Sequence, residues 1–335
     1  MNNSICSSQS NVKNLPKETV AKNSQQFYED VLEGLSQYPK KLPSKYFYNA
    51  AGDRLFQQIM HSADYYLTRC ELDIFTTRLP EMTKLLIKEG TPFDLIELGP
   101  GDCYKSIHLM KALTKQQATF NYLPIDISGA VLDLINTTLP ALLPGMPIIP
   151  LHGEYFRMLS KANKHSANRK VVLCLGSNIG NMSMMESHAF CQDLRRHLDP
   201  GDLVIMGFDL VKNPNMIRMA YNDRDGITSQ FNLNLLKRIN HELGGNFNLD
   251  DFEHYCSYEP ETGACKSFLV CLEDRTVRIR DTTISFKKNE YIWMEISQKF
   301  TQEQVDDLAL KNGFKPVSNL MDSKQWFVDA CWVVL

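Results

Sequence analysis

Long apolar segments and a dominant sign of charge are both missing from this sequence. No run approaches the roughly 18 consecutive apolar residues that a membrane-spanning helix requires, and the net charge is only −3. Lys and Arg are scattered along the chain and form no stripe, which argues against a phosphate-backbone partner. We therefore expect neither a membrane nor a nucleic acid among the partners of this protein.

The residue spacings of metal sites and disulfide frameworks are also missing. The nine cysteines are irregularly spaced with no C-x-x-C, and no two histidines form an H-x-x-x-H pair. An odd number of scattered cysteines argues against disulfides and against a zinc site. Cys174, Cys271 and Cys331 lie inside apolar runs, where a free cysteine behaves as a small buried hydrophobe. We therefore assign no metal and expect a reducing, cytoplasmic location.

The N-terminal segment, residues 1–26, is rich in Ser, Asn, Gln and Lys and contains no apolar stretch of the kind found in secretion signals. We expect it to be a disordered tail and not a signal peptide. Helical spacing of apolar residues begins at Gln25–Gln37, and a further helix is predicted over Arg69–Glu89 with a break near Pro80.

The segment from residue 93 to about 209 alternates short apolar runs with helical patterns. Strands are predicted at Phe93–Leu98, Thr119–Ile125, Pro147–Leu151, Lys170–Leu175 and Asp202–Phe208, and helices at Lys105–Leu113, Gly129–Leu134 and Met185–His197. This alternation predicts parallel strands joined by right-handed crossovers in a doubly wound α/β sheet.

The alternation stops after Asp209. The remaining predicted elements are a helix within residues 213–250, two β-rich stretches at Lys266–Arg280 and Thr283–Ser297, a helix at Gln302–Asn312 and a strand at Gln325–Leu335. The simplest interpretation is a parallel sheet that is interrupted by an inserted lobe and then receives its last strands.

The most informative stretch follows the first of these strands. The run Phe93–Leu98 ends in Glu97-Leu98 and breaks into Gly99-Pro100-Gly101 before a helix. Glycines at such a turn let the backbone approach a nucleotide ligand. Dinucleotide enzymes favour G-x-G-x-x-G, but Tyr104 stands at the third glycine position. The turn therefore favours S-adenosylmethionine over a nicotinamide cofactor, although glycines that serve only the packing of the turn also fit.

Polar residues follow the other predicted strands. Asp126 ends the second strand, where an acid accepts hydrogen bonds from a ribose, although Asp126 or Ser128 also fits a helix cap. Glu154-Tyr155 fits either contact with an adenine or a surface turn. The stretch Gly176–Asn181 fits either a ligand crevice or ordinary turn chemistry.

The motifs of this chain, taken together, resemble a known family. Those that carry the resemblance are Lys45-Tyr46-Phe47-Tyr48, Tyr65-Tyr66-Leu67-Thr68-Arg69, Glu97-Leu98-Gly99-Pro100-Gly101, Gly176-Ser177-Asn178-Ile179-Gly180-Asn181, Phe231-Asn232-Leu233-Asn234 and Glu295-Ile296-Ser297-Gln298-Lys299-Phe300. They look like the histidine Nα-methyltransferases of ergothioneine biosynthesis, and the resemblance runs from about residue 40 to the C-terminus. That family trimethylates the α-amino group of L-histidine to hercynine with S-adenosylmethionine, which becomes S-adenosylhomocysteine.

The resemblance implies a fold and a set of site residues. The fold is a class I S-adenosylmethionine-dependent methyltransferase, Rossmann-like with a mostly parallel seven-stranded sheet and a second, smaller α+β lobe. The cofactor positions are Tyr48, Gly99, Lys105, Asp126, Glu154 and Tyr155. The substrate positions are Tyr65, Gly176, Asn181, Tyr221, Ser267, Glu295 and Ser297. Residues 74–210 with 299–335 are assigned to the cofactor domain, and residues 27–73 with 211–298 to the substrate lobe. We expect a monomer.

The chain departs from the family pattern at a few positions. Glu154-Tyr155 replaces the usual Asp-Phe pair, and Pro100 replaces a Ser or Thr in the glycine turn. Ser267 aligns with a position of the substrate pocket that is often Met, which makes the pocket wall smaller and more polar. A related aromatic substrate such as tryptophan therefore remains an alternative to histidine, as does a non-catalytic adenosyl-binding protein.

The chemistry itself asks little of the protein. An α-amino group with a pKa of about 8 is partly neutral near pH 7, so methyl transfer needs no strong base. Tyr48, Asn181 and Tyr221 are accordingly predicted to orient the amine and not to take its proton. Glu295 and Ser297 alternate along one strand and so face the same side. There a carboxylate and a hydroxyl can satisfy both nitrogens of an imidazole, although Glu295 also fits a solvent-facing position on an edge strand.

Overall fold

The computed structural model describes residues 17–88 and 90–335. Residues 1–16 of the predicted tail lie outside the described part, and the rest of that segment belongs to helix α1 (Lys17–Ser36), which begins earlier than the sequence predicts. The described chain divides into two compact units. One comprises the residues up to Asp53 with Ser229–Tyr255 and Phe268–Met294. The other, here called the sheet unit, comprises Arg54–Thr228, Cys256–Ser267 and Glu295–Leu335.

The sheet unit contains a seven-stranded sheet with the order β12-β13-β6-β5-β2-β3-β4. Its strands are β2 (Phe93–Leu98), β3 (Phe120–Asp126), β4 (Leu151–His152), β5 (Arg169–Cys174), β6 (Leu203–Asp209), β12 (Phe314–Met321) and β13 (Phe327–Val334). All neighbouring pairs are parallel except those made by β13, which is antiparallel to both of its neighbours. The predicted doubly wound, mostly parallel sheet is therefore confirmed.

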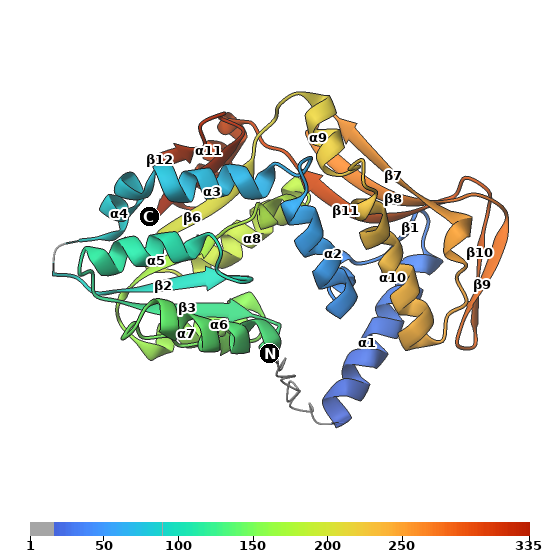
Figure 1. Cartoon of the computed structure of the whole chain (residues 1–335), viewed down its shortest axis with the longest axis horizontal. Coiled ribbons are helices and arrows are strands. Elements are labelled where there is room, and N and C mark those ends of the chain that lie inside the picture. The colour runs from blue at the N-terminus through green and yellow to red at the C-terminus, as the bar shows by residue number, and fades with distance from the viewer. Residues whose placement is uncertain (1–16, 89) are drawn as a thin grey trace, which may run out of the picture. The chain divides into compact units, whose positions relative to one another are not determined.

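Helices cover both faces of this sheet (Figure 1). One face packs against α3 (Leu67–Thr77), α4 (Leu79–Leu86), α5 (Ser106–Lys115) and α6 (Gly129–Leu142), and the other against α7 (Tyr155–His165), α8 (Met184–Arg196) and α11 (Gln302–Lys311). Successive residues of a strand serve opposite faces: in β2, Leu95 lies in the first core and Ile96 in the second. A strand buried on both faces is largely apolar, which is why the run Phe93–Leu98 could be recognised from the sequence although it contains Asp94 and Glu97.

Some elements differ from the prediction. The helix predicted over Arg69–Glu89 is two helices, α3 and α4, that meet at Arg78. Strand β4 (Leu151–His152) shares only Leu151 with the predicted strand Pro147–Leu151. Strand β12 was not predicted from the sequence; it carries Pro316 at a register shift beside its partner β13. Proline cannot donate to a strand ladder and is tolerated at an irregularity or an edge, so its presence disguised this strand.

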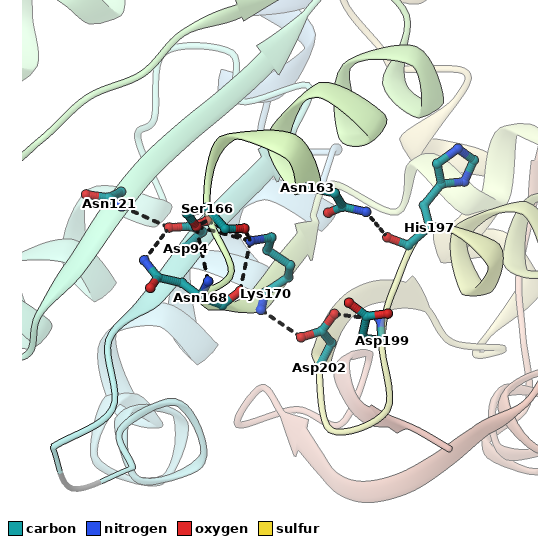
Figure 2. A network of polar contacts seen from close by, with 9 residues as sticks. All are labelled: Asp94, Asn121, Asn163, Ser166, Asn168, Lys170, His197, Asp199 and Asp202. Carbon is teal, nitrogen blue, oxygen red and sulfur yellow. Dashed lines mark hydrogen bonds and ion pairs between the residues drawn. The ribbon is translucent and has the colours of Figure 1, made fainter.

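A buried ion pair ties together the amino ends of β2 and β5 (Figure 2). The Asp94 carboxylate accepts hydrogen bonds from Asn121, Ser166, Asn168 and Lys170, the last at 2.9 Å. Burial opposes ionisation, but these hydrogen bonds hold the pKa of Asp94 below its ordinary value. The carboxyl ends of the strands lie at the opposite edge of the sheet, so this polar cluster stabilises the fold at a distance from the ligand edge of a doubly wound sheet.

The other unit contains α1, β1 (Lys40–Lys41), most of α10 (Ile227–Leu243), and the pair β9 (Arg275–Ile279) and β10 (Thr282–Phe286). The remaining strands, β7 (Phe252–Glu259), β8 (Ala264–Cys271) and β11 (Tyr291–Gln298), run through both units and belong to a four-stranded sheet of order β1-β11-β8-β7. The predicted smaller lobe with a second sheet is thus present. Its strand β7 was missed, although its alternating burial has the period of two expected of a half-exposed strand.

Two of the sequence motifs lie against each other within this unit. The ring of Phe47, from the aromatic motif, lies 4.8 Å from that of Phe231 at the start of the Phe231–Asn234 motif. Asn234 donates a hydrogen bond of 3.0 Å to the side chain of Asn49. These two motifs, although far apart in the sequence, therefore pack against each other in the folded chain.

Helices long and apolar enough to cross a membrane do not occur in the described part of the chain. Among the same residues, no cluster of three or more His, Cys, Asp or Glu could hold a metal ion.

Candidate functional site

The glycine turn after β2 has the backbone conformation that its sequence requires. Gly99 and Gly101 have φ values of +67° and +57°, in the left-handed region that glycine alone adopts without strain. The preceding Glu97 is buried and accepts a hydrogen bond of 2.6 Å from Tyr122 of β3. Burial raises the pKa of Glu97 to about 7. This hydrogen bond therefore joins the end of β2 to β3 next to the glycine turn.

Gly99 lies directly beside Tyr155, the first residue of α7. A Cβ placed on Gly99 would come within 2.7 Å of the Tyr155 hydroxyl oxygen, whereas one on Gly101 would meet open space. Asp126, at the end of β3, accepts a hydrogen bond of 2.7 Å from the backbone of Ser128, and its charge contributes to the raised pKa of Tyr155 after burial. Three of the predicted cofactor residues, Gly99, Asp126 and Tyr155, are thus close together at the carboxyl edge of the sheet.

A buried carboxylate of helix α3 joins two more predicted residues. Both oxygens of Glu71 accept from the backbone N–H of Gly176, at 2.7 and 3.0 Å, and Glu71 also forms an ion pair with Lys105. Gly207 of β6 makes room for this carboxylate, because a Cβ there would lie 2.5 Å from Glu71 Oε1. Burial and the neighbouring Glu71 raise the pKa of Asp329 on β13 well above its usual range, which favours the uncharged form of Asp329.

A second buried cluster lies at the end of β6. The Asp209 carboxylate forms ion pairs with Lys212 and with Lys299, the latter at 2.8 Å, and all three side chains are almost completely shielded from solvent. The hydroxyl of Tyr66 donates a hydrogen bond of 2.8 Å to Asp209. One carboxylate is therefore shared by two buried lysine side chains.

The same cluster includes two of the predicted substrate residues. Lys299 Nζ donates hydrogen bonds to the Tyr221 hydroxyl, at 2.7 Å, and to the Ser297 hydroxyl, at 2.8 Å. The two hydroxyl oxygens are 2.6 Å apart and share a further hydrogen bond. The ring of Tyr65 meets that of Tyr221 edge-on, with a centroid separation of 6.0 Å. Tyr65, Tyr221 and Ser297 are therefore neighbours, although they come from three distant parts of the sequence.

Glu295 precedes Ser297 by two residues on β11 and is half-buried. Burial raises the pKa of its carboxyl to about 7, and the charge of Lys299 opposes that rise. Because the Glu295 side chain is half-buried, the fully solvent-facing alternative is disfavoured. Ser267 on β8 is buried, 4% exposed.

The remaining predicted residues are more exposed or lie elsewhere. Asn181 ends the short helix η2 (Asn178–Asn181) after β5, and Glu154 precedes α7; both are exposed. Tyr48 belongs to the unit that holds α1, where its ring lies 5.8 Å from that of Phe231. Its part in a site with the residues of the sheet unit stays a prediction.

Sequence reasoning missed Glu71, Asp209 and Lys299. Tyr66 lies in one of the motifs that carry the resemblance; it is buried and bonds to Asp209. Lys299 lies in another of these motifs, and Asp209 directly follows the predicted strand Asp202–Phe208, as Asp126 follows the predicted strand Thr119–Ile125. The signal that could have found Asp209 is therefore the same one: an acid at the carboxyl end of a parallel strand.

Comparison with known proteins places these residues in context. A family model described as "Histidine-specific methyltransferase, SAM-dependent" matches residues 27–334. The chain is 34% identical over 278 residues to histidine N-alpha-methyltransferase of Mycolicibacterium smegmatis, covering 82% of this chain and 85% of that protein. It is 27% identical over 284 residues to ergothioneine biosynthesis protein 1 of Schizosaccharomyces pombe, covering 83% and 37% of the two chains. It is 28% identical over 202 residues to 4-dimethylallyltryptophan N-methyltransferase easF of Claviceps fusiformis, covering 58% and 56%.

Proposed function

Because the chain belongs to the family of histidine-specific, S-adenosylmethionine-dependent methyltransferases, we propose that it trimethylates the α-amino group of L-histidine to give hercynine. S-adenosylmethionine is its cofactor, and the predicted class I methyltransferase fold is present. The observation that carries the histidine assignment is the arrangement of half-buried Glu295 and Tyr221 and buried Ser297, the last two bonded to Lys299, which pairs with Asp209. These side chains can form hydrogen bonds with the nitrogens of an imidazole ring.

The residues at the carboxyl edge of the sheet fit an adenosyl cofactor. Gly101 leaves bare backbone facing open space beside the point where β2 separates β3 from β5, and this is where doubly wound sheets bind nucleotides. Asp126 would hold the ribose, Glu154 and Tyr155 the adenine, and Gly99, Lys105 and Tyr48 the remainder. When bound, the cofactor supplies an electrophilic methyl group on a sulfonium. We keep residues 74–210 with 299–335 as the cofactor-binding portion, and residues 27–73 with 211–298 as the substrate-binding portion.

The protein's contribution to the reaction is mainly orientation. The attacking amine must be neutral, and at pH 7 to 8 a usable fraction of an amino group with a pKa of about 8 already is. Among the orienting residues, Tyr65 and Tyr221 are poor bases because burial raises the pKa of each hydroxyl well above its usual range and so favours the protonated form. Together with Asn181, Tyr48 and the backbone at Gly176, they hold the amine in line, and holding reactants in line can supply most of the rate.

Glu295 and Ser297 recognise the imidazole ring of the substrate. Glu295, as a carboxylate, accepts the N–H of the imidazole, and Ser297 serves the other ring nitrogen. A ring that lacks those nitrogens leaves buried polar groups unpaired, and such mismatches discriminate by orders of magnitude. Ser267, buried on β8, the strand beside β11 in the four-stranded sheet, would form a polar part of the wall.

A second candidate keeps the chemistry and changes the amino acid. The similarity to an N-methyltransferase whose name specifies 4-dimethylallyltryptophan, and Ser267 at a position often held by Met, favour an indole amino acid as this alternative. An indole has one ring N–H and no ring acceptor, so it would use Glu295 but not both members of the Glu295–Ser297 pair.

Mass spectrometry of the reaction products tests the proposal. Purified protein incubated with L-histidine and S-adenosylmethionine should yield histidine that carries three methyl groups, all on the α-nitrogen, with S-adenosylhomocysteine as the co-product. Methylation of a ring nitrogen, or no histidine product at all, would overturn the assignment.

Enlarging the glycine turn should weaken cofactor binding. A Gly99→Ala variant places a Cβ 2.7 Å from the Tyr155 hydroxyl and pushes that ring out of place. We expect the Kd for S-adenosylhomocysteine, measured by calorimetry, to rise roughly tenfold or more, which corresponds to about 1.4 kcal/mol. Gly145→Ala is the matched control: its φ is +81° but its Cβ meets open space, so it should lower stability and leave the Kd within about twofold. Equal Kd values for both variants would remove Gly99 from the cofactor site.

The pH dependence of product binding should show the titration of Glu295. Hercynine is the best probe because its quaternary amine does not titrate. Glu295, with a pKa of about 7 in the free protein, accepts the ring N–H strongly only after it loses its proton, and the imidazole, with a pKa of about 6.5, must be neutral to offer a bare nitrogen to Ser297. Binding should therefore tighten as pH rises and level off above about pH 7.5.

Below both pKa values the Kd of the wild type should rise by about two decades for each unit that the pH falls, and that of Glu295→Gln by about one decade. Calorimetry in the presence of S-adenosylhomocysteine measures both slopes. The same slope in both proteins would show that Glu295 does not contact the ring.

A further inference from the structure

The hydrogen bonds of Lys299 constrain the protons of its two hydroxyl partners. A lysine ammonium only donates, so the Tyr221 and Ser297 oxygens both accept from Lys299, at 2.7 and 2.8 Å. The two hydroxyls are themselves bonded at 2.6 Å. One of them must donate to the other, and this uses one of the two hydroxyl protons.

The count leaves a single hydroxyl proton for any further partner. The hydroxyl that accepts from both Lys299 and its neighbour has no lone pair left and can act only as a donor. A phenol is a better hydrogen-bond donor than an aliphatic alcohol, so the favoured arrangement has Tyr221 donating to Ser297. Ser297 is then the hydroxyl with its lone pairs filled and its proton available.

From this geometry we propose that Lys299 is a positioning residue for substrate recognition: it fixes Ser297 as a hydrogen-bond donor and so selects a ligand that presents an acceptor at that point. This inference rests on the proposed function, in which Ser297 meets the substrate ring. The matching acceptor is the bare nitrogen of a neutral imidazole, whose N–H is taken by Glu295. An imidazolium or an indole brings no acceptor and leaves the Ser297 proton unpaired.

Asp209 keeps the ammonium of Lys299 in place. Lys299 is completely buried and pairs with Asp209 at 2.8 Å, and a buried charge without such a partner is strongly disfavoured. Lys212 pairs with the same carboxylate but bonds to Tyr66 and to the backbone of Leu210. The two lysines therefore share a counter-ion and differ in what else they contact, which provides a matched control.

The test is a double-mutant cycle in the full chain. Lys299→Met, Ser297→Ala and the double variant are compared with the wild type for kcat and KM with L-histidine and for the Kd of S-adenosylhomocysteine. We expect each single change to raise KM roughly 10- to 100-fold and the double variant to be no worse than the poorer single, because Lys299 acts through Ser297. The Kd should stay within about threefold, which shows that the fold is retained. Lys212→Met should leave KM within about threefold.

Fold changes in KM that multiply in the double variant would overturn the proposal, as would an unchanged KM in Lys299→Met. The wild-type protein offers a second measurement that needs no substitution at Lys299. A histidine analogue with a pyrrole ring keeps a ring N–H and lacks the acceptor nitrogen. It should bind to the wild type at least about tenfold more weakly than histidine does, whereas Ser297→Ala should bind the analogue and histidine about equally well. Equal binding of both ligands to the wild type would contradict the inference. Absence of histidine methylation by the wild type would instead overturn the proposed function on which the inference rests.

Discussion

Replacing Glu295 by alanine is expected to raise the KM for L-histidine about 10- to 150-fold. A hydrogen bond to a charged group contributes about 1.5 to 3 kcal/mol, and each 1.4 kcal/mol is a factor of ten. The half-buried carboxyl of Glu295, whose pKa burial raises to about 7, is the acceptor proposed for the ring N–H. Without it, that N–H has no partner in the pocket, so the loss should appear in KM and in kcat/KM.

Steady-state kinetics and calorimetry check this expectation together. The Kd of the Glu295→Ala protein for S-adenosylhomocysteine should be that of the wild type, because none of the proposed cofactor contacts involves Glu295. Glu261→Ala is the control: this glutamate is exposed in the turn between β7 and β8, and its removal should leave both constants unchanged. A wild-type KM in Glu295→Ala would mean that the substrate ring lies elsewhere.

Neutralising Asp209 is expected to destabilise the protein by about 3 to 5 kcal/mol, because it leaves buried ammonium groups without a counter-charge. Lys212 and Lys299 both pair with this carboxylate and are at most 5% exposed. The Asp209→Asn variant should also raise the KM for histidine, since Lys299 is no longer held against Tyr221 and Ser297. Urea denaturation measures the free energy of unfolding, and steady-state kinetics under folded conditions measures KM.

Asp94→Asn separates these two effects. It removes the charge that pairs with buried Lys170 (Figure 2) and should destabilise the protein by a similar amount, about 3 to 5 kcal/mol. Because Asp94 lies at the amino end of β2, the KM of the folded fraction should not change. Asp193→Ala, which breaks an exposed pair with Arg196, should cost less than about 1 kcal/mol. A change of KM in Asp94→Asn equal to that in Asp209→Asn would remove the special role assigned to the Asp209 cluster.

The central part of the fold could be predicted from the sequence because local patterns determine it. Strand β2 was predicted with its observed ends, since a strand covered on both faces is largely apolar and the glycines of the following turn mark where it stops. Strand β12 could not be recognised in the same way, because Pro316 and polar residues interrupt its apolar pattern. Its place in the sheet depends on pairing with β13, which is a long-range property.

The candidate site shows the same division. Gly99, Asp126 and Gly176 were predicted because each follows an apolar run at the carboxyl end of a strand. Glu71 could not be found in this way: it contacts Gly176 from 105 residues away, and only the packing of α3 brings them together. Asp209 and Tyr66 are 143 residues apart. Buried charges are tolerated only where partners surround them, and a single sequence does not state which partners the fold supplies.

The proposal that the substrate is histidine, and not an indole amino acid, can be tested directly. Its most direct test is a competition in which the protein receives equal concentrations of L-histidine and L-tryptophan with S-adenosylmethionine, and mass spectrometry follows both products from the same reaction. The ratio of the two initial rates gives the ratio of the kcat/KM values. We predict that trimethylated histidine forms at least about a hundredfold faster, as expected where a substrate leaves buried polar groups unpaired. Faster methylation of tryptophan would contradict the account.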